Sequence, residues 1–507
     1  MPSIDAVLSR AAEYAPSRIA VREWESGREI SYQRLDRWAS AIARRLAADG
    51  IGKGSRVGIH LPNGGHFLAA QFGSMRAGAV ASFVNYRLHP TEAIRQLVMA
   101  QARAIVTTAE RAAAFRNENA LQGALFLLDD GAPPLGESLP ELLEGAASDP
   151  FFPPVELEDA DAIARFTSGS TGAPKGVLVS HRAWLIRAVS ILAEELKVDL
   201  HSTTMVLGPL SHQAGLFVLP TFMRQGTMLT FDHFDLGKAA SALKSLPVAQ
   251  MQMVPTMLQM ILEHGEMREA LAASGIRRIV YGGSPIGEKV IEAALDLLPH
   301  CDFVQGYGSH EAGAISHLDG PAHRDPLLRR SAGRPFLAAE VRIAAPAGAD
   351  YGEIEVRAPW TPRARITDQG REPVTEEWIP TGDLGELRDG FVFLMDRAND
   401  LIISGGFNVY PSEVETVLNA HPDVAVSAVV SMPDSKWGEK VIAYVVPQRD
   451  RAPDESVLRD YCKSRLSGYK VPKEYRSIAE LPLNANGKPD RRRLSDPLWQ
   501  GRGRRIN

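Results

Sequence analysis

The sequence predicts an α/β protein, in which a large N-terminal domain of helix-covered, mainly parallel sheets precedes a small α+β domain. Short apolar strands alternate with helical patterns through most of the first 340 residues, as in parallel sheets covered by helices. Beyond that point, Glu340–Ile343 and Gly352–Val356 alternate apolar and polar residues, which is typical of antiparallel strands. The chain of 507 residues is also longer than a domain built on a single hydrophobic core usually is, so we expect at least two domains.

Local periodicity locates the elements of the large domain. Apolar residues recur at helical spacing from Ser31 to Ala48, which predicts a helix. Strands are predicted at Arg56–Leu61, at Ala104–Thr107 and at a segment that ends with Ile279–Val280, just before a Gly-Gly turn.

A compact unit begins at Leu401. It is predicted to contain, in order, a strand at 401–404, a turn at 405–408, a helix from Pro411 through Val417, strands near Ala425–Val430 and Val441–Val446, and a helix near Ser456–Leu466. This order is typical of a separate α+β domain of about 100 residues.

Composition limits the classes of partner. The net charge of -5 is small for this length, so neither nucleic acid nor an anionic membrane is expected. Cys301 and Cys462 are far apart and form no CxxC pair, which favours a reducing cytoplasm. The N-terminal segment is charged throughout, so we expect no signal peptide, and no apolar run reaches the ~20 residues of a membrane span.

The segment Thr167–Gly176, TSGSTGAPKG, is the strongest chemical signal. Its glycines let the backbone approach a ligand closely, while its hydroxyls and a lysine supply donors, so we expect a phosphate cradle. It is not a GxxxxGK[ST] loop, because Pro174 precedes the lysine and no Ser or Thr follows. A flexible Gly/Ser hairpin loop is the alternative. The predicted nucleotide-binding residues are Thr167, Ser168, Gly169, Ser170, Thr171, Gly172 and Lys175.

This string resembles the signature of the adenylate-forming enzymes: acyl-CoA synthetases, the adenylation domains of peptide synthetases, and firefly-type luciferases. The resemblance continues in order along nearly the whole chain, through PLSHQAG (209–215), YGGSP (281–285), QGYGSHE (305–311), TGD (381–383), DRANDLIISGGFNVYPSEVE (396–415) and LPLNANGK (481–488). It implies a small β-barrel-like subdomain in the large domain and a mobile C-terminal domain.

The resemblance also assigns nucleotide contacts. Tyr307 is expected to stack on adenine, Asp383 to accept the ribose hydroxyls, and Arg397 to contact ribose or phosphate. The other residues implied to bind ATP or AMP are Gly282, Gly283, Ser284, Gly306, Gly308 and His310. The family has threonine where this chain has His310. Histidine can still donate a hydrogen bond, but it is larger and titrates near neutrality, so rate and pH dependence are expected to differ rather than reaction class.

The catalytic residues follow by the same resemblance. Lys488 matches the family's catalytic lysine, and Glu311, His212 and Lys175 are the other catalytic candidates. Glu311 and Thr171 are expected to hold Mg²⁺, which prefers hard oxygen ligands.

Asp400 falls at the family's hinge, which divides the chain into an ATP- and acyl-binding domain at 1–397 and a C-terminal domain at 398–507. The residues expected to bind CoA are Gly405, Gly406, Trp437, Tyr469, Lys473 and Arg87. The candidates for the acyl pocket are Trp184, His212, Gln213, Ala214, Gly282 and Gly306. A bulky indole among small residues suits an aromatic or medium-chain acid better than a long chain.

The sequence therefore predicts an ATP-dependent acid–CoA ligase that uses ATP, Mg²⁺ and coenzyme A, with a homodimer as a possible assembly. One alternative is an adenylation enzyme that loads a carrier protein or activates an amino acid. Amino-acid activators usually carry an aspartate near the PLxHxxG segment, where this chain has Ser-His-Gln-Ala-Gly. The other alternative is a nucleotide-binding protein without turnover, to which His310 points; Lys488, Glu311 and Asp383 argue against it.

Overall fold

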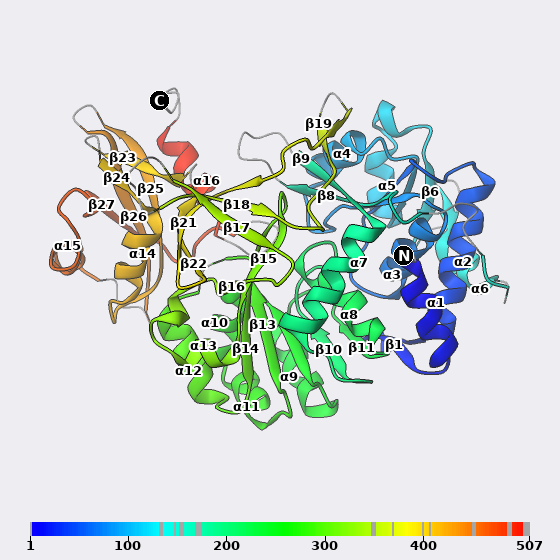
Figure 1. Cartoon of the computed structure of the whole chain (residues 1–507), viewed down its shortest axis with the longest axis horizontal. Coiled ribbons are helices and arrows are strands. Elements are labelled where there is room, and N and C mark those ends of the chain that lie inside the picture. The colour runs from blue at the N-terminus through cyan, green and yellow to red at the C-terminus, as the bar shows by residue number, and fades with distance from the viewer. Residues whose placement is uncertain are drawn as a thin grey trace.

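The parallel sheets predicted from the sequence form the body of the molecule (Figure 1). The computed structural model describes residues 3–130, 135–146, 149–151, 157–167, 175–284, 286–345, 351–367, 370–397, 400–404, 407–434, 437–448, 453–483 and 489–499. Within these residues the strands form two nine-stranded sheets, one four-stranded sheet and one five-stranded sheet.

The first large sheet carries most of the loops that resemble family motifs. Its order is β16 (Arg334–Pro335), β15 (Gly313–Leu318), β14 (Asp302–Ser309), β13 (Arg278–Gly282), β12 (Gln250–Met253), β10 (Thr203–Val206), β11 (Thr227–Thr230), β1 (Ile19–Glu23) and β2 (Glu29–Ser31). The strands from β14 to β1 pair in parallel, whereas both edges are antiparallel. A separate apolar cluster joins this sheet to helices α9 (Leu236–Ser245), α10 (Pro255–Glu263), α11 (Gly265–Ala273) and α12 (Glu288–Leu297).

The second large sheet has the order β20 (Gly370–Pro373), β19 (Ala364–Thr367), β9 (Lys175–Ser180), β8 (Asp161–Thr167), β4 (Val80–Phe83), β3 (Arg56–Ile59), β5 (Ala104–Thr107), β6 (Leu125–Leu128) and β7 (Glu137–Ser138). Its strands from β8 to β7 run parallel, and β8 pairs antiparallel with β9. One apolar cluster joins this sheet to α4 (Pro90–Met99) and α5 (Ala109–Phe115).

A shared apolar core holds the two large sheets together. It combines residues of both sheets with helices α1 (Asp5–Tyr14), α2 (Tyr32–Ala48), α3 (Gly65–Arg76), α6 (Leu139–Glu144), α7 (His181–Ser190) and α8 (Val218–Met223). The helix predicted from Ser31 is α2, and Ser31 is its N-cap, accepting a 3.2 Å hydrogen bond from the Arg34 amide. Each large apolar side chain fully buried here contributes ~1.5–3 kcal/mol.

The segment after residue 340 is antiparallel, as predicted. It forms the four-stranded sheet β17 (Glu340–Ala344), β18 (Gly352–Arg357), β21 (Ile379–Arg388) and β22 (Phe391–Arg397). Helix α13 (Gly320–Arg324) precedes it.

The C-terminal unit contains β23 (Ile402–Ser404), β24 (Phe407–Val409), α14 (Pro411–Asn419), β25 (Val424–Asp434), β26 (Gly438–Pro447), α15 (Glu455–Lys463), β27 (Glu474–Ser477) and α16 (Arg491–Ser495). The predicted turn at 405–408 is partly wrong, because Phe407 and Asn408 belong to β24, which pairs antiparallel with β23. The extended backbone lets the Phe407 ring stack on Tyr469, with centroids 4.8 Å apart. No helix in the described part of the chain has the length and apolar character needed to cross a bilayer.

Candidate active site

The loops that resemble family motifs follow neighbouring strands of the first large sheet. His212 lies beyond the end of β10, Gly283 follows β13, and His310 follows β14. Because these strands are parallel, their carboxyl ends meet at one edge of the sheet, where α/β proteins bind ligands. The register places Gly282 directly opposite Gly306. The topology thus gathers three separate motifs at one edge.

Asn63 connects the second large sheet to the loop that carries His212. Its side-chain amide donates to Gly208 O and Phe231 O, both at 3.1 Å, and its carbonyl oxygen accepts from the Leu210 amide at 2.8 Å. Asn63 itself follows β3 of the second sheet. One side chain therefore fixes the start of the PLSHQAG loop against both sheets.

Two histidines meet at this edge. The rings of His212 and His310 are T-shaped, with centroids 6.2 Å apart. His212 Nδ1 also lies 3.0 Å from the Ser211 hydroxyl. The structure thus brings together the predicted acyl-side histidine and the residue that replaces the family threonine.

Glycines allow close approach beside these histidines. A Cβ at Gly282 would lie 2.2 Å from Gly306 O and 2.9 Å from Gln213 Nε2, so neither position tolerates a larger residue without rearrangement. Gly282, Gly306 and Gln213, all predicted to line the acyl pocket, therefore lie in contact. A Cβ at Gly306 would lie 2.6 Å from Glu195 Oε1, a side chain that no sequence motif indicated.

Tyr307 and Asp383 form a direct contact. The Tyr307 hydroxyl donates to Asp383 Oδ2 at 2.7 Å. The TGD turn fixes the aspartate: the Thr381 hydroxyl accepts from the Asp383 amide at 3.1 Å and donates to Ile354 O at 2.8 Å. Asp383 also lies opposite Arg397 in the β21–β22 register. The predicted adenine and ribose contacts are therefore neighbours.

Other predicted nucleotide contacts are only partly described. Gly308 lies in β14 opposite Ala314, and Ser284 lies in the turn after β13. Thr167 and Lys175 face each other across the β8–β9 pair. The side chains of Thr167, Lys175 and Arg397 lie outside the described residues, as do Ser168, Gly169, Ser170, Thr171, Gly172, Gly405, Gly406 and Lys488.

Glu311 lies in the turn between β14 and β15, where the Ala312 amide donates to the Ser309 hydroxyl at 2.9 Å. Its side chain is half-buried. No hydrogen bond or ion pair joins its carboxylate to another side chain in the described part of the chain. No group of three or more His, Cys, Asp and Glu residues in the described ranges could hold a metal ion.

The C-terminal unit presents a partly exposed aromatic surface. The Lys473 ammonium lies 5.6 Å from the Trp437 ring centroid and donates to Gly468 O at 3.1 Å. Tyr469 stacks on Phe407, whose side chain is 57% exposed. Three of the residues predicted to bind CoA therefore lie on this unit. Arg87 instead lies on the large domain, where it lines a small cavity with Ser211 of the PLSHQAG segment.

Ion pairs link the predicted hinge to the C-terminal unit. Arg491 of α16 contacts Asp400 Oδ2 at 3.2 Å and Glu415 Oε2 of α14 at 2.6 Å. A second link joins the large domain to this unit, because Lys289 of α12 donates to Ala420 O at 2.9 Å, at the C-terminal end of α14.

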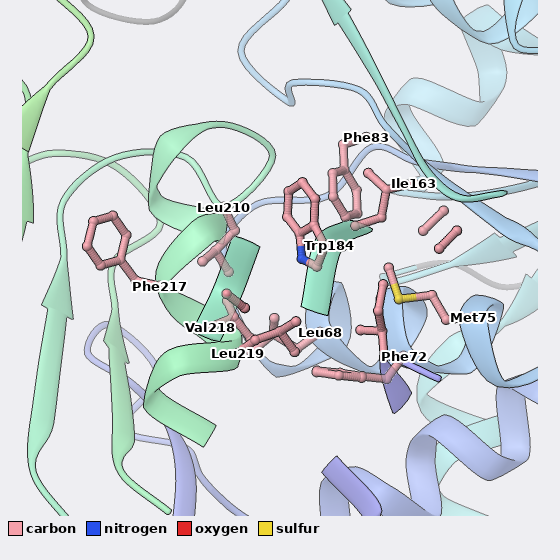
Figure 2. Close-up of a cluster of buried hydrophobic side chains, with 14 of the residues drawn as sticks. Leu68, Phe72, Met75, Phe83, Ile163, Trp184, Leu210, Phe217, Val218 and Leu219 are labelled. Atoms are coloured by element: carbon pink, nitrogen blue, oxygen red, sulfur yellow. The ribbon is translucent and has the colours of Figure 1, made fainter. Parts of the chain in front are cut away.

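Trp184, a predicted pocket residue, is 4% exposed and belongs to the shared core, as does Ala214. Figure 2 shows its indole between Phe83 and Leu210. The guanidinium carbons of Arg187 and Arg165 lie 5.3 Å and 5.9 Å from the indole centroid. The indole thus contacts both apolar side chains and buried charge.

No sequence motif indicated Arg187 or Glu195. Burial lowers the pKa of Arg187 to about 9, with Arg165 contributing. Burial raises the pKa of Glu195 to about 7, although Arg187 opposes the shift. The only available signal was spacing, because Trp184, Arg187, Ile191 and Glu195 recur three or four residues apart, as on one face of a helix.

The resemblance assigns the tyrosine to adenine and the aspartate of the TGD turn to ribose, and the structure joins the two by a hydrogen bond at the carboxyl edge of a parallel sheet. The chain belongs to the family of AMP-binding enzymes. That family's model matches residues 8–363, and the model of the AMP-binding enzyme C-terminal domain matches residues 413–488.

Similar proteins share nearly the whole chain. A feruloyl-CoA synthase from Amycolatopsis is 35% identical over 94% of this chain and 96% of its own length. A fatty acid–[acyl-carrier-protein] ligase from Streptomyces coeruleorubidus is 31% identical over 95% of this chain and 94% of its own. The solved structure of o-succinylbenzoate CoA synthetase from Bacillus subtilis, with its acyl-adenylate intermediate, has a TM-score of 0.82, is 27% identical and covers 99% of both chains. Family and relatives together make this chain an AMP-forming acyl-CoA synthetase.

Proposed function

We propose that this enzyme activates an aromatic carboxylic acid with ATP and transfers the acyl group to coenzyme A. In the first step an oxygen of the acid attacks the α-phosphate, and pyrophosphate leaves with the bonding electron pair. In the second step the CoA thiolate attacks the acyl carbon, and AMP leaves. The observation that carries the proposal is the Tyr307–Asp383 hydrogen bond at the sheet edge that also presents His212 and His310.

The nucleotide is proposed to lie along this edge. Tyr307 would stack on adenine while Asp383 accepts the ribose hydroxyls, so their mutual hydrogen bond sets the spacing of the two contacts. Negative charge builds on the phosphate oxygens during displacement. Lys175 and Lys488 would offset it, as preorganised cations do in phosphoryl transfer.

Glu311 is proposed to bind Mg²⁺ with Thr171 and the phosphates of ATP. The carboxylate of Glu311 fits a hard divalent cation. When bound, the ion supplies charge neutralisation at the phosphates.

The second step is proposed to require rotation of a C-terminal domain, residues 398–507, about Asp400. The surface formed by Trp437, Lys473 and Tyr469 would then meet the large domain near Arg87 and bind CoA. Gly405 and Gly406 would approach the pantetheine arm.

The aromatic substrate class has two supports. The resemblance assigns Trp184, a bulky indole, and the closely packed Gly282 and Gly306 to the acyl pocket, which suits a flat ring. The names of the feruloyl-CoA and o-succinylbenzoate relatives also refer to aromatic acids. A carrier-protein thiol is the second candidate acceptor, because one relative is named as a ligase of that kind.

Pyrophosphate release should be measured with benzoates, cinnamates and C2–C16 fatty acids, with and without CoA. We expect the highest kcat/KM for an aromatic acid, and thioester formation with CoA. The Lys488→Ala variant should lose adenylation but still convert preformed acyl-AMP to thioester. Lys463 is an exposed lysine of α15, and the control variant Lys463→Ala should match the native enzyme in both steps. Pyrophosphate release from long-chain acids alone would refute the aromatic class, and equal loss of both steps in Lys488→Ala would refute the lysine's role.

A further inference from the structure

A group of buried charges lies beside the proposed acyl pocket. Arg187 and Glu195 are each 6% exposed, and Arg165 is 8% exposed. Buried charges are uncommon in proteins unless they are paired and hydrogen-bonded. This group therefore requires an explanation beyond packing.

Two of these side chains border residues assigned to the acyl pocket. Glu195 Oε1 lies 2.6 Å from where a Cβ of Gly306 would stand. The Arg187 guanidinium lies 5.3 Å from the Trp184 ring centroid, and its Nη1 lies 3.7 Å from where a Cβ of Gly313 would stand. The carboxylate and the guanidinium thus approach the same region from one helical segment.

Within the described residues, the side chains of Arg187 and Glu195 lack hydrogen-bond partners. In the described part of the chain, neither Arg187 nor Glu195 makes a side-chain hydrogen bond, and Arg187 Nε is buried without a partner. Arg187 and Glu195 are close enough for their charges to influence each other's pKa, but no direct ion pair joins them within those ranges. Most buried polar groups in proteins are hydrogen-bonded, and a polar group of a ligand that reaches this region would satisfy both side chains.

The backbone supports this interpretation. Glu195 belongs to a π-helical turn, Ile191–Leu196, which directly follows α7. Such turns are rare and frequently occur at functional sites. The side chain of the neighbouring Glu194 does have a partner, because its Oε2 accepts a 3.0 Å hydrogen bond from the Leu337 amide.

We propose that Arg187 and Glu195 recognise a hydroxyl group at the distal end of the substrate, so that the preferred acid is a hydroxylated aromatic acid. This inference rests on the proposed function and narrows its substrate class from aromatic acids to hydroxylated aromatic acids. A hydroxyl donates to the Glu195 carboxylate and accepts from the Arg187 guanidinium, which satisfies both groups at once. An unsubstituted aryl or alkyl end would leave both unpaired, and a second carboxylate would be repelled by Glu195.

The test compares kcat/KM for pyrophosphate release at pH 8 among 4-hydroxycinnamate, 4-methoxycinnamate, cinnamate, 4-carboxycinnamate and octanoate. We expect the native enzyme to prefer 4-hydroxycinnamate over cinnamate by roughly 10- to 100-fold, the range of a charged hydrogen bond. The methoxy compound, which accepts but cannot donate, should fall between them.

Glu195→Gln and Arg187→Met should each reduce this preference at least fivefold, mainly by slowing the hydroxylated acid. Glu194→Gln is the matched control from the same turn and should keep the native preference. Thermal unfolding of every variant checks that the fold is retained.

The outcomes separate the two proposals. Equal use of cinnamate and 4-hydroxycinnamate by the native enzyme, or a preference for 4-carboxycinnamate or octanoate, would overturn the hydroxyl assignment. An unchanged preference in both folded variants would also overturn it. Activity with any aromatic acid would still leave the proposed function standing, whereas no pyrophosphate from any acid would overturn both.

Discussion

The hydroxyl of Tyr307 donates a 2.7 Å hydrogen bond to Asp383, and the two residues come from different sheets. Tyr307 lies in β14 of the first large sheet, and Asp383 lies in β21 of the four-stranded sheet. The bond therefore fixes the position of one sheet relative to the other at the point where a nucleotide is proposed to bind.

Tyr307→Phe tests this link. The ring that would stack on adenine remains, but the hydrogen bond from Tyr307 to Asp383 is lost. The KM for ATP should therefore rise roughly 5- to 20-fold, corresponding to ~1–2 kcal/mol, while kcat changes less. Initial rates of pyrophosphate release against ATP concentration measure the effect. Tyr281 also lies in the first large sheet, and its buried hydroxyl is hydrogen-bonded to His323 of α13. Tyr281→Phe should lower the melting temperature instead. An unchanged KM in Tyr307→Phe would contradict the proposed nucleotide position.

Asp400→Pro should leave adenylation intact and lower thioester formation at least tenfold. Proline fixes φ and removes the amide donor, so a backbone rotation at this residue is blocked. The two steps are measured separately, by pyrophosphate release and by conversion of preformed acyl-AMP. Arg491→Met removes the same ion pair, together with the pair to Glu415, without altering the backbone, and so serves as the control. If both variants lose thioester formation equally, Asp400 acts through its ion pair and is not a pivot.

Glu195→Gln should stabilise the ligand-free protein at and above neutral pH. Burial raises the pKa of Glu195 from its ordinary value of 4.5 to about 7, so between these values the folded state binds more protons than the unfolded state. Stability therefore falls as pH rises from about 4.5 to about 7, by up to ~3 kcal/mol from this one group. Denaturant unfolding at pH 5 and pH 8 should show a smaller difference for Glu195→Gln than for the native chain. Parallel pH dependence in the two proteins would argue against a buried ionisable Glu195.

A double-mutant cycle tests the contact between His212 and His310. If the T-shaped pair acts as a unit, the effects of His212→Ala and His310→Thr on the adenylation rate should be non-additive by ~0.5–1 kcal/mol. Single-turnover rates for the four proteins give the coupling energy. Additive effects would show that the rings touch without sharing a role in the first step.

Much of this architecture could be predicted because periodicity and motif order are local properties of the chain. The helix at Tyr32–Ala48 and the strand at Ala104–Thr107 follow from spacing alone. The motifs at His212, Gly282 and Tyr307 were expected in one site because they resemble successive motifs of one family, and the carboxyl ends of the parallel strands bring them together at one edge.

Other features depend on packing between distant segments. Nothing in the sequence indicates that Asn63 holds the loop of His212, because the two are about 150 residues apart and share no pattern. Glu195 lies in the string AEEL, which usually indicates an exposed helix face; burial follows from the π-helical turn and from the space that Gly306 leaves. Phe407 was expected in a turn, and its extended backbone reflects stacking on Tyr469, more than 60 residues later.

The ammonium of Lys289, in the large domain, donates to Ala420 O at the C-terminal end of α14. The contact between the large domain and the C-terminal unit is therefore partly electrostatic. The carbonyl oxygens at a helix C-terminus carry partial negative charge, and a cation placed there gains from the helix dipole. Dissolved ions screen such a charge–dipole attraction when it is exposed to solvent. The population of the docked arrangement is therefore expected to shift with ionic strength, so that the relative speeds of the two half-reactions depend on the electrolyte as well as on the substrates.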